Sequence, residues 1–210
     1  MTSARDTVLG RVRDALALAP TPATSVPRGY RTGRTLPDGE RLALFTDRLV
    51  DYKAEVHPCT ADRTAQVVAR VLRDHGARRI GVPAGLDPRW LDAYDGEVCP
   101  DAADIPAPQL DALDAVVTAS AAGCAETGTI FLDGSPDQGR RALSLVPDLH
   151  LCVVDLSAVA AGVPEAVARL VPERPTTLIS GPSATSDIEL ERVEGVHGPR
   201  RLVVVIRTDS

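Results

Sequence analysis

The chain has 210 residues, 44% of them hydrophobic and 25% charged, which is ordinary for a globular protein of one domain or one domain with a small appendage. Its formal net charge is −6, and no basic stripe with interleaved aromatic residues occurs, which argues against nucleic-acid binding. No apolar run reaches the length of a membrane span, and the N-terminus lacks the apolar region of a signal peptide, so we expect a cytoplasmic protein without a membrane span.

The N-terminal segment predicts a helical arm. Residues 5–19 place Val8, Val12 and Leu16 on one face of a helix, with arginines on the other. The residues that follow are rich in proline and glycine and predict an extended linker. An isolated helix of this length is marginal in water, so the arm needs a partner surface, either its own domain or another chain, as in a homo-oligomer. We therefore divide the chain into an arm with its linker, 1–39, and an α/β domain, 40–210.

The remaining sequence predicts alternating strands and helices. Helices are expected over 40–51, 60–76, 88–93, 139–147 and 163–171, and strands over 54–59, 78–83, 96–100, 114–120, 129–134, 149–156, 176–180 and 200–208. The strand–helix–strand rhythm indicates parallel pairing with right-handed crossovers. The continuous apolar runs LCVV and VVVI indicate strands covered on both faces. The predicted fold class is α/β, an open Rossmann-like and mostly parallel sheet with helices on both faces, plus the N-terminal helical arm.

One connection is too short for that rhythm. Only eight residues separate Ser120 from Thr129, whereas a parallel crossover needs about a dozen or more. The segment is therefore either a hairpin or a single helical turn that leads to a strand elsewhere in the sheet.

The four cysteines do not predict a metal centre. Cys59, Cys99, Cys124 and Cys152 stand far apart, and no CxxC or Cys/His cluster offers metal-ligand spacing. We expect isolated thiols and no metal bound by this chain.

Two loops fit the place where open α/β sheets bind ligands, which is beyond the carboxyl ends of strands. In the loop over 179–189, Ser186 and Glu189 match a capping box, which is a purely structural explanation. The same loop could instead hold a ligand with Gly181, Ser183, Thr185, Ser186 and Asp187. An anion there would be repelled by the acids of the first helical turn, so Asp187 suits a cationic or hydroxyl-bearing ligand, or a metal, better.

The other loop lies within TASAAGCAETGTIFL, residues 118–132, and contains Glu126. A carboxylate before a glycine turn is usually a solvated turn residue. Here, however, Glu126 follows an apolar strand and is itself followed by Thr127, Gly128 and Thr129, small residues of the kind needed where a backbone approaches a ligand. We take Glu126 as the first candidate catalytic residue and the next three as ligand-binding candidates. His197, between two turn glycines, is the second catalytic candidate if it lies beside Glu126 or Asp187.

Four segments in order, AETGTIFL (125–132), SLVPDLHLCVV (144–154), ISGPSATSDIE (179–189) and EGVHGPRRLVVVI (194–206), resemble the lactate utilization protein C family, also called the LUD domain. The resemblance covers essentially the whole chain. It implies a fold similar to the NagB/RpiA/CoA-transferase-like superfamily. It also implies a role in oxidising L-lactate to pyruvate beside two iron–sulfur partner proteins, so the clusters are expected on those partners and none in this chain.

The sequence departs from the family pattern at Ala184, where an arginine is usual. If that arginine binds an anion in relatives, the contact is absent here or is supplied by another group. The alternative function is a stand-alone transferase or ligase. It would bind a CoA-, nucleotide- or folate-type ligand at Glu126 and the loop over 181–187, which rests on analogy between folds.

Overall fold

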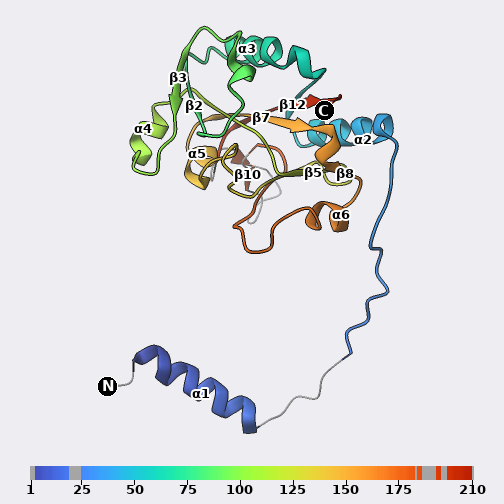
Figure 1. Cartoon of the computed structure of the whole chain (residues 1–210), viewed down its shortest axis with the longest axis vertical. Coiled ribbons are helices and arrows are strands. Elements are labelled where there is room, and N and C mark those ends of the chain that lie inside the picture. The colour runs from blue at the N-terminus through green and yellow to red at the C-terminus, as the bar shows by residue number, and fades with distance from the viewer. Residues whose placement is uncertain (1–2, 19–24, 183, 186–192, 195–197, 210) are drawn as a thin grey trace. The chain divides into compact units, whose positions relative to one another are not determined.

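The computed structural model describes residues 3–18, 25–182, 184–185, 193–194 and 198–209, and it divides the chain into two compact units, Met1–Arg31 and Thr32–Ser210 (Figure 1). The first unit contains helix α1 (Ala4–Leu18), which confirms the predicted N-terminal helix. No residue of helix α1 is buried: Val8, Val12 and Leu16 are 60%, 50% and 64% exposed.

The second unit is built on a six-stranded sheet in the order β1-β12-β7-β4-β2-β3, and every described pairing in it is parallel. Its strands are β1 (Glu55–Cys59), β2 (Arg79–Val82), β3 (Glu97–Pro100), β4 (Ala115–Thr118), β7 (Leu149–Asp155) and β12 (Arg201–Arg207). From β2 the chain moves outward to β3, returns to β4 on the other side of β2, and then continues through β7 to β12. The order therefore reverses between β2 and β4. The predicted open parallel sheet is confirmed.

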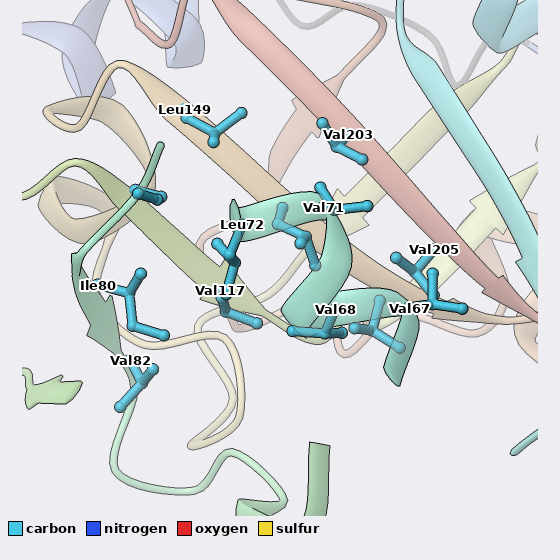
Figure 2. Close-up of a cluster of buried hydrophobic side chains, with 14 of the residues drawn as sticks. Val67, Val68, Val71, Leu72, Ile80, Val82, Val117, Leu149, Val203 and Val205 are labelled. Carbon is cyan, nitrogen blue, oxygen red and sulfur yellow. The ribbon is translucent and has the colours of Figure 1, made fainter. Parts of the chain in front are cut away.

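Helix α3 (Thr64–Asp74), preceded by the 3-10 turn Ala61–Arg63, covers one face of this sheet. Its apolar side chains recur at helical spacing and point at the strands, so the burial follows from the sequence pattern. Figure 2 shows Val67, Val68, Val71 and Leu72 packed against side chains from β2, β4, β7 and β12. The helix ends at Asp74, and Gly76 follows in a left-handed conformation, as expected of a C-terminal glycine.

The opposite face is covered by helix α2 (Asp38–Asp51) and by a second sheet. Phe45 and Leu49 of α2 are fully buried among Val204 and Ile206 of β12, Cys152 and Val154 of β7, and Ile130 of the second sheet. Two short helices, α4 (Ala107–Asp111) and α5 (Arg141–Leu145), cover the rest of this face through Leu110 and Leu143. Helices thus lie on both faces, as predicted.

The second sheet was not predicted. It has the order β8-β5-β6-β9, with the bounds β5 (Ala122–Cys124), β6 (Thr129–Leu132), β8 (Val159–Ala160) and β9 (Thr177–Ile179). Strands β5 and β6 pair antiparallel, so the short connection after Ser120 is a hairpin. The strands expected over 129–134 and 176–180 therefore exist but belong to this sheet. Helix α6 (Val163–Val167) is shorter than the predicted 163–171. The remaining described elements are the 3-10 turns Pro88–Leu91, where a helix was expected over 88–93, and Leu156–Ala158, and a pair of two-residue strands, β10 (Ala184–Thr185) and β11 (Val193–Glu194).

Candidate functional site

Glu126 lies in the four-residue turn of the β5–β6 hairpin and is half-buried. The turn is fixed to the neighbouring strand: the Ala125 N–H donates to the Ala160 carbonyl at 2.9 Å, and the Glu126 N–H donates to the Ala161 carbonyl at 3.2 Å. Because the hairpin belongs to the second sheet, Glu126 does not follow a strand of the parallel sheet, which is where we had placed it. Instead the turn lies against the C-terminal end of α2.

Gly128 and Gly181 fix both sequence-predicted loops on that end of α2. Both have positive φ angles, +60° and +82°. A Cβ atom on Gly128 would lie 2.9 Å from the Arg48 carbonyl carbon, and one on Gly181 would lie 2.5 Å from the Tyr52 carbonyl oxygen. The sequence suggested that these glycines allow close approach to a ligand. In the structure the close neighbour is the backbone of α2 and its C-terminal cap.

A chain of hydroxyl groups connects the two loops. Thr127 Oγ1 lies 2.8 Å from Thr129 Oγ1, which in turn lies 2.8 Å from Ser180 Oγ. This follows from strand pairing, since Ile130 of β6 is opposite Ile179 of β9 and their neighbours Thr129 and Ser180 therefore meet. The structure thus brings Thr127, Gly128 and Thr129 next to Gly181. Ser180, which the sequence analysis did not select, is the residue that links them.

The other predicted site residues are placed only in part. Thr185 belongs to β10, where its backbone pairs with Val193. Ser183, Ser186, Asp187 and His197 lie outside the described residues, as does the capping box that begins at Ser186.

A cavity of about 280 Å³, here called the β9 cavity, opens beside Ser180 and Gly181. Its described lining residues are Arg141, Ser144, Leu145, His150, Thr177–Pro182, Gly198, Pro199 and Leu202. His150 and Leu202 are the second residues of β7 and β12. The β9 cavity therefore lies toward the amino ends of these parallel strands, on the face covered by the second sheet.

His150 forms part of the β9 cavity and is 1% exposed. Its Nε2 atom lies 2.8 Å from Thr118 Oγ1 on the adjacent strand β4. Burial lowers the pKa of His150 to about 4, so the imidazole is neutral at physiological pH. The sequence reasoning missed this residue, although a histidine within the otherwise apolar run LHLCVV is a signal that could have selected it.

Two larger cavities, each of about 510 Å³, lie at the carboxyl edge of the parallel sheet, where we had expected the site. One, near β2 and β3, includes Ser135 and the ion pair in which Arg140 Nε donates to Asp101 Oδ2 at 2.9 Å, and it shares Arg141, Ser144 and Thr177 with the β9 cavity. The other includes Trp90, whose ring lies 5.5 Å beneath the Arg207 guanidinium carbon. None of the predicted site residues lines either of them.

The buried Asp133 and the half-buried Asp137 and Asp155 also lie at this carboxyl edge. Burial raises the pKa of Asp137, and the nearby Asp133 and Asp155 raise it further. The negative charge of Asp133 is balanced by Arg174, whose Nη1 donates to Asp133 Oδ2 at 2.9 Å. No group of three His, Cys, Asp or Glu side chains with an arrangement fit to hold a metal ion occurs among the described residues.

The fold defines an open, doubly wound α/β protein whose parallel sheet carries a small antiparallel sheet on one face. Residues 42–206 match the LUD domain, and the chain belongs to this family, which confirms the resemblance seen in the sequence. It is 48% identical, over 84% of each chain, to a protein of Deinococcus radiodurans named Lactate utilization protein C. It is 31% identical, over 97% of its length and 93% of the relative's, to a protein of Neisseria meningitidis serogroup B.

A crystal structure of a DUF162 family protein from Deinococcus radiodurans has the same fold, with a TM-score of 0.71 and 40% sequence identity. The match covers 82% of this chain and 99% of that one. In the described part of the chain, no helix is both long enough and apolar enough to cross a membrane.

Proposed function

We propose that the protein works in lactate utilization, as an accessory subunit of a system that oxidises L-lactate to pyruvate together with iron–sulfur partner proteins. The observation that carries the proposal is the 48% identity, over 84% of both chains, with the protein named Lactate utilization protein C. The match covers 84% of both chains, and the LUD domain itself spans residues 42–206, so the proposal concerns the domain and not a shared motif.

We assign the iron–sulfur clusters to the partner proteins because the cysteines of this chain lie on separate strands. All four are free thiols. Cys59 lies on β1 and Cys99 on β3, the two opposite edges of the parallel sheet, while Cys124 and Cys152 are buried in separate strands. An iron–sulfur cluster requires several thiolates around one centre, which this arrangement does not provide.

Gene deletion in the native host tests the proposal. We expect the deletion strain to lose growth on L-lactate while it grows normally on a sugar, and a plasmid copy to restore growth. A tagged copy should co-purify with an iron–sulfur protein from lactate-grown cells. Normal growth on L-lactate together with the absence of any co-purifying iron–sulfur protein would contradict it.

The hydroxyl chain Thr127–Thr129–Ser180 favours a second candidate, because it joins the Glu126 turn to Gly181 in one neighbourhood. In this alternative a stand-alone transferase or ligase binds a CoA-, nucleotide- or folate-type ligand there, with Glu126 as nucleophile or general base. A thermal-shift panel of CoA esters, nucleotides and folates tests it, and flat results would argue against it. Growth on L-lactate with Glu126→Gln, compared with the exposed control Glu173→Gln, tests the role of that carboxylate in either scheme.

A further inference from the structure

The β9 cavity has an unusual charge for this protein. The chain carries a net charge of −6, yet no carboxylate side chain is found among the described residues that line this cavity. Its single cationic lining residue in that set is Arg141, accompanied by the hydroxyl groups of Ser144, Thr177 and Ser180. We infer that the β9 cavity binds the carboxylate of a small organic acid and that Arg141 pairs with it.

Arg141 is available for a ligand, whereas its neighbour is not. Arg140 donates from Nε and Nη2 to the Asp101 carboxylate, at 2.9 Å each, and from Nη2 to the Ile105 carbonyl at 2.7 Å. The side chain of Arg141 is exposed and makes no hydrogen bond or ion pair with the described residues, while its backbone carbonyl accepts from Ser144 Oγ at 3.3 Å. A guanidinium presents a fork of donors that matches a carboxylate, and such charge-assisted pairs are the strong ones.

The charge of the described lining residues favours a monoanion. His150 is neutral above about pH 4, so Arg141 supplies the one positive charge of the described lining. A monocarboxylate balances that charge. A phosphate dianion would leave one negative charge uncompensated in a partly enclosed site, where such a charge is costly.

The size and walls of the cavity narrow the ligand class further. A volume of about 280 Å³ lies at the lower limit for ligand sites and is too small to enclose a whole nucleotide or CoA. Leu145, Ile179 and Leu202 provide apolar walls, and the hydroxyl groups retain capacity to bond a polar substituent near the carboxylate. Short 2-hydroxy and 2-oxo monoacids fit this description. Their choice as first probes rests on the proposed function, whereas the pairing of a carboxylate with Arg141 does not.

Isothermal titration calorimetry on the full chain tests the inference with acetate, L-lactate, pyruvate, inorganic phosphate and the uncharged analogue lactamide. We expect at least one of the three acids to bind, and lactamide and phosphate to bind at least about tenfold more weakly than that acid. Arg141→Gln should lower the affinity for the acid by at least about tenfold. Arg141→Lys keeps the positive charge but loses the forked guanidinium donors, so it should lower the affinity by less. Arg73→Gln, an equal change of charge at an exposed site on α3, should leave the affinity within about twofold.

Several results would overturn the inference: no binding of any acid at tens of millimolar, equal affinity of lactamide or phosphate, or an unchanged affinity in Arg141→Gln. Since Arg141 is exposed, the variant should keep the thermal midpoint of the wild type, and circular dichroism verifies this before titration. The growth experiment is independent of this one. If the deletion strain grows on L-lactate but the purified protein binds monoacids through Arg141, the proposed function is refuted and the binding site is supported.

Discussion

Gly181 packs directly against the backbone of Tyr52, the C-terminal cap of helix α2. The φ angle of Gly181 is +82°, and a Cβ atom built there would lie 2.5 Å from the Tyr52 carbonyl oxygen. The contact joins the end of strand β9 to a helix about 130 residues earlier in the chain. It also sets where Ser180 lies, and Ser180 links the hairpin hydroxyls to the β9 cavity.

Gly181→Ala should therefore destabilise the protein. The substitution forces an alanine into the left-handed conformation, which residues with a Cβ atom disfavour. It also forces the Tyr52 backbone to move. We expect a loss of about 2–4 kcal/mol in the free energy of unfolding, measured by urea denaturation. Gly39→Ala is the matched control, because nothing lies within 4 Å of a Cβ atom there and the residue is in the first turn of α2. Equal unfolding midpoints for both variants would contradict the packing described.

The hydroxyl of Thr129 should matter for stability. Thr129 is 6% exposed, and its Oγ1 contacts the hydroxyls of Thr127 and Ser180. Thr129→Val leaves these two groups without their common partner, so we expect a loss of about 1–3 kcal/mol in urea unfolding. Thr46→Val is the control of identical chemistry. The Oγ1 atom of Thr46 is buried and has no hydrogen-bond partner in the described chain, so that variant should be neutral or more stable. If the two substitutions have the same effect, the hydroxyl chain is not stabilising.

The sequence predicted the parallel sheet well because its signals are local. The runs LCVV and VVVI are apolar without alternation, and β7 and β12 are indeed buried on both faces. The helical spacing of Val67, Val68, Val71 and Leu72 predicted the packing of α3 in the same way. In each case the periodicity within one segment determines which surface is buried.

The second sheet and the β9 cavity could not be predicted, because they depend on contacts between distant segments. Strands β5 and β8, of three and two residues, carry no periodic signal, and their pairing depends on how the chain leaves β4 and β7. A glycine can indicate a positive φ angle, but nothing in the sequence near Gly181 identifies Tyr52 as its neighbour. Arg141 and His150 likewise meet in one cavity only because α5 precedes β7 on the face that β9 covers.

His150 should make stability depend on pH in the range where an ordinary histidine titrates. Burial lowers its pKa in the native state from 6.5 to about 4, so between these values the unfolded state binds a proton that the native state does not. The free energy of unfolding is therefore unaffected by this group above pH 6.5. It falls as the pH drops from 6.5 toward 4, by up to about 1.4 kcal/mol per pH unit and on the order of 3 kcal/mol in total.

Urea unfolding of the wild type and of His150→Gln at half-unit steps from pH 8 to pH 4.5 checks this slope. The variant loses the contact with Thr118 and will be less stable at pH 8, so the informative quantity is the difference between the two curves. That difference should be constant above pH 6.5 and should shrink as the pH falls below it. Curves that stay parallel over the whole range would show that His150 is not buried in its neutral form.

Cys152 should resist alkylation as long as the protein is folded. It is fully buried on β7, and burial raises its pKa to about 12, whereas a free cysteine titrates near 8.5. Because the thiolate is the reactive form, the fraction available at pH 8 falls by roughly a thousandfold, and the surrounding strands exclude the reagent as well. We expect iodoacetamide at pH 8 to modify the half-buried Cys99 and Cys59 first and to leave Cys152 unmodified, with peptide mass spectrometry as the measurement. In concentrated urea all four cysteines should react at similar rates. Labelling of Cys152 at the rate of Cys99 in the native protein would mean that β7 opens to solvent, which is incompatible with a strand covered on both faces.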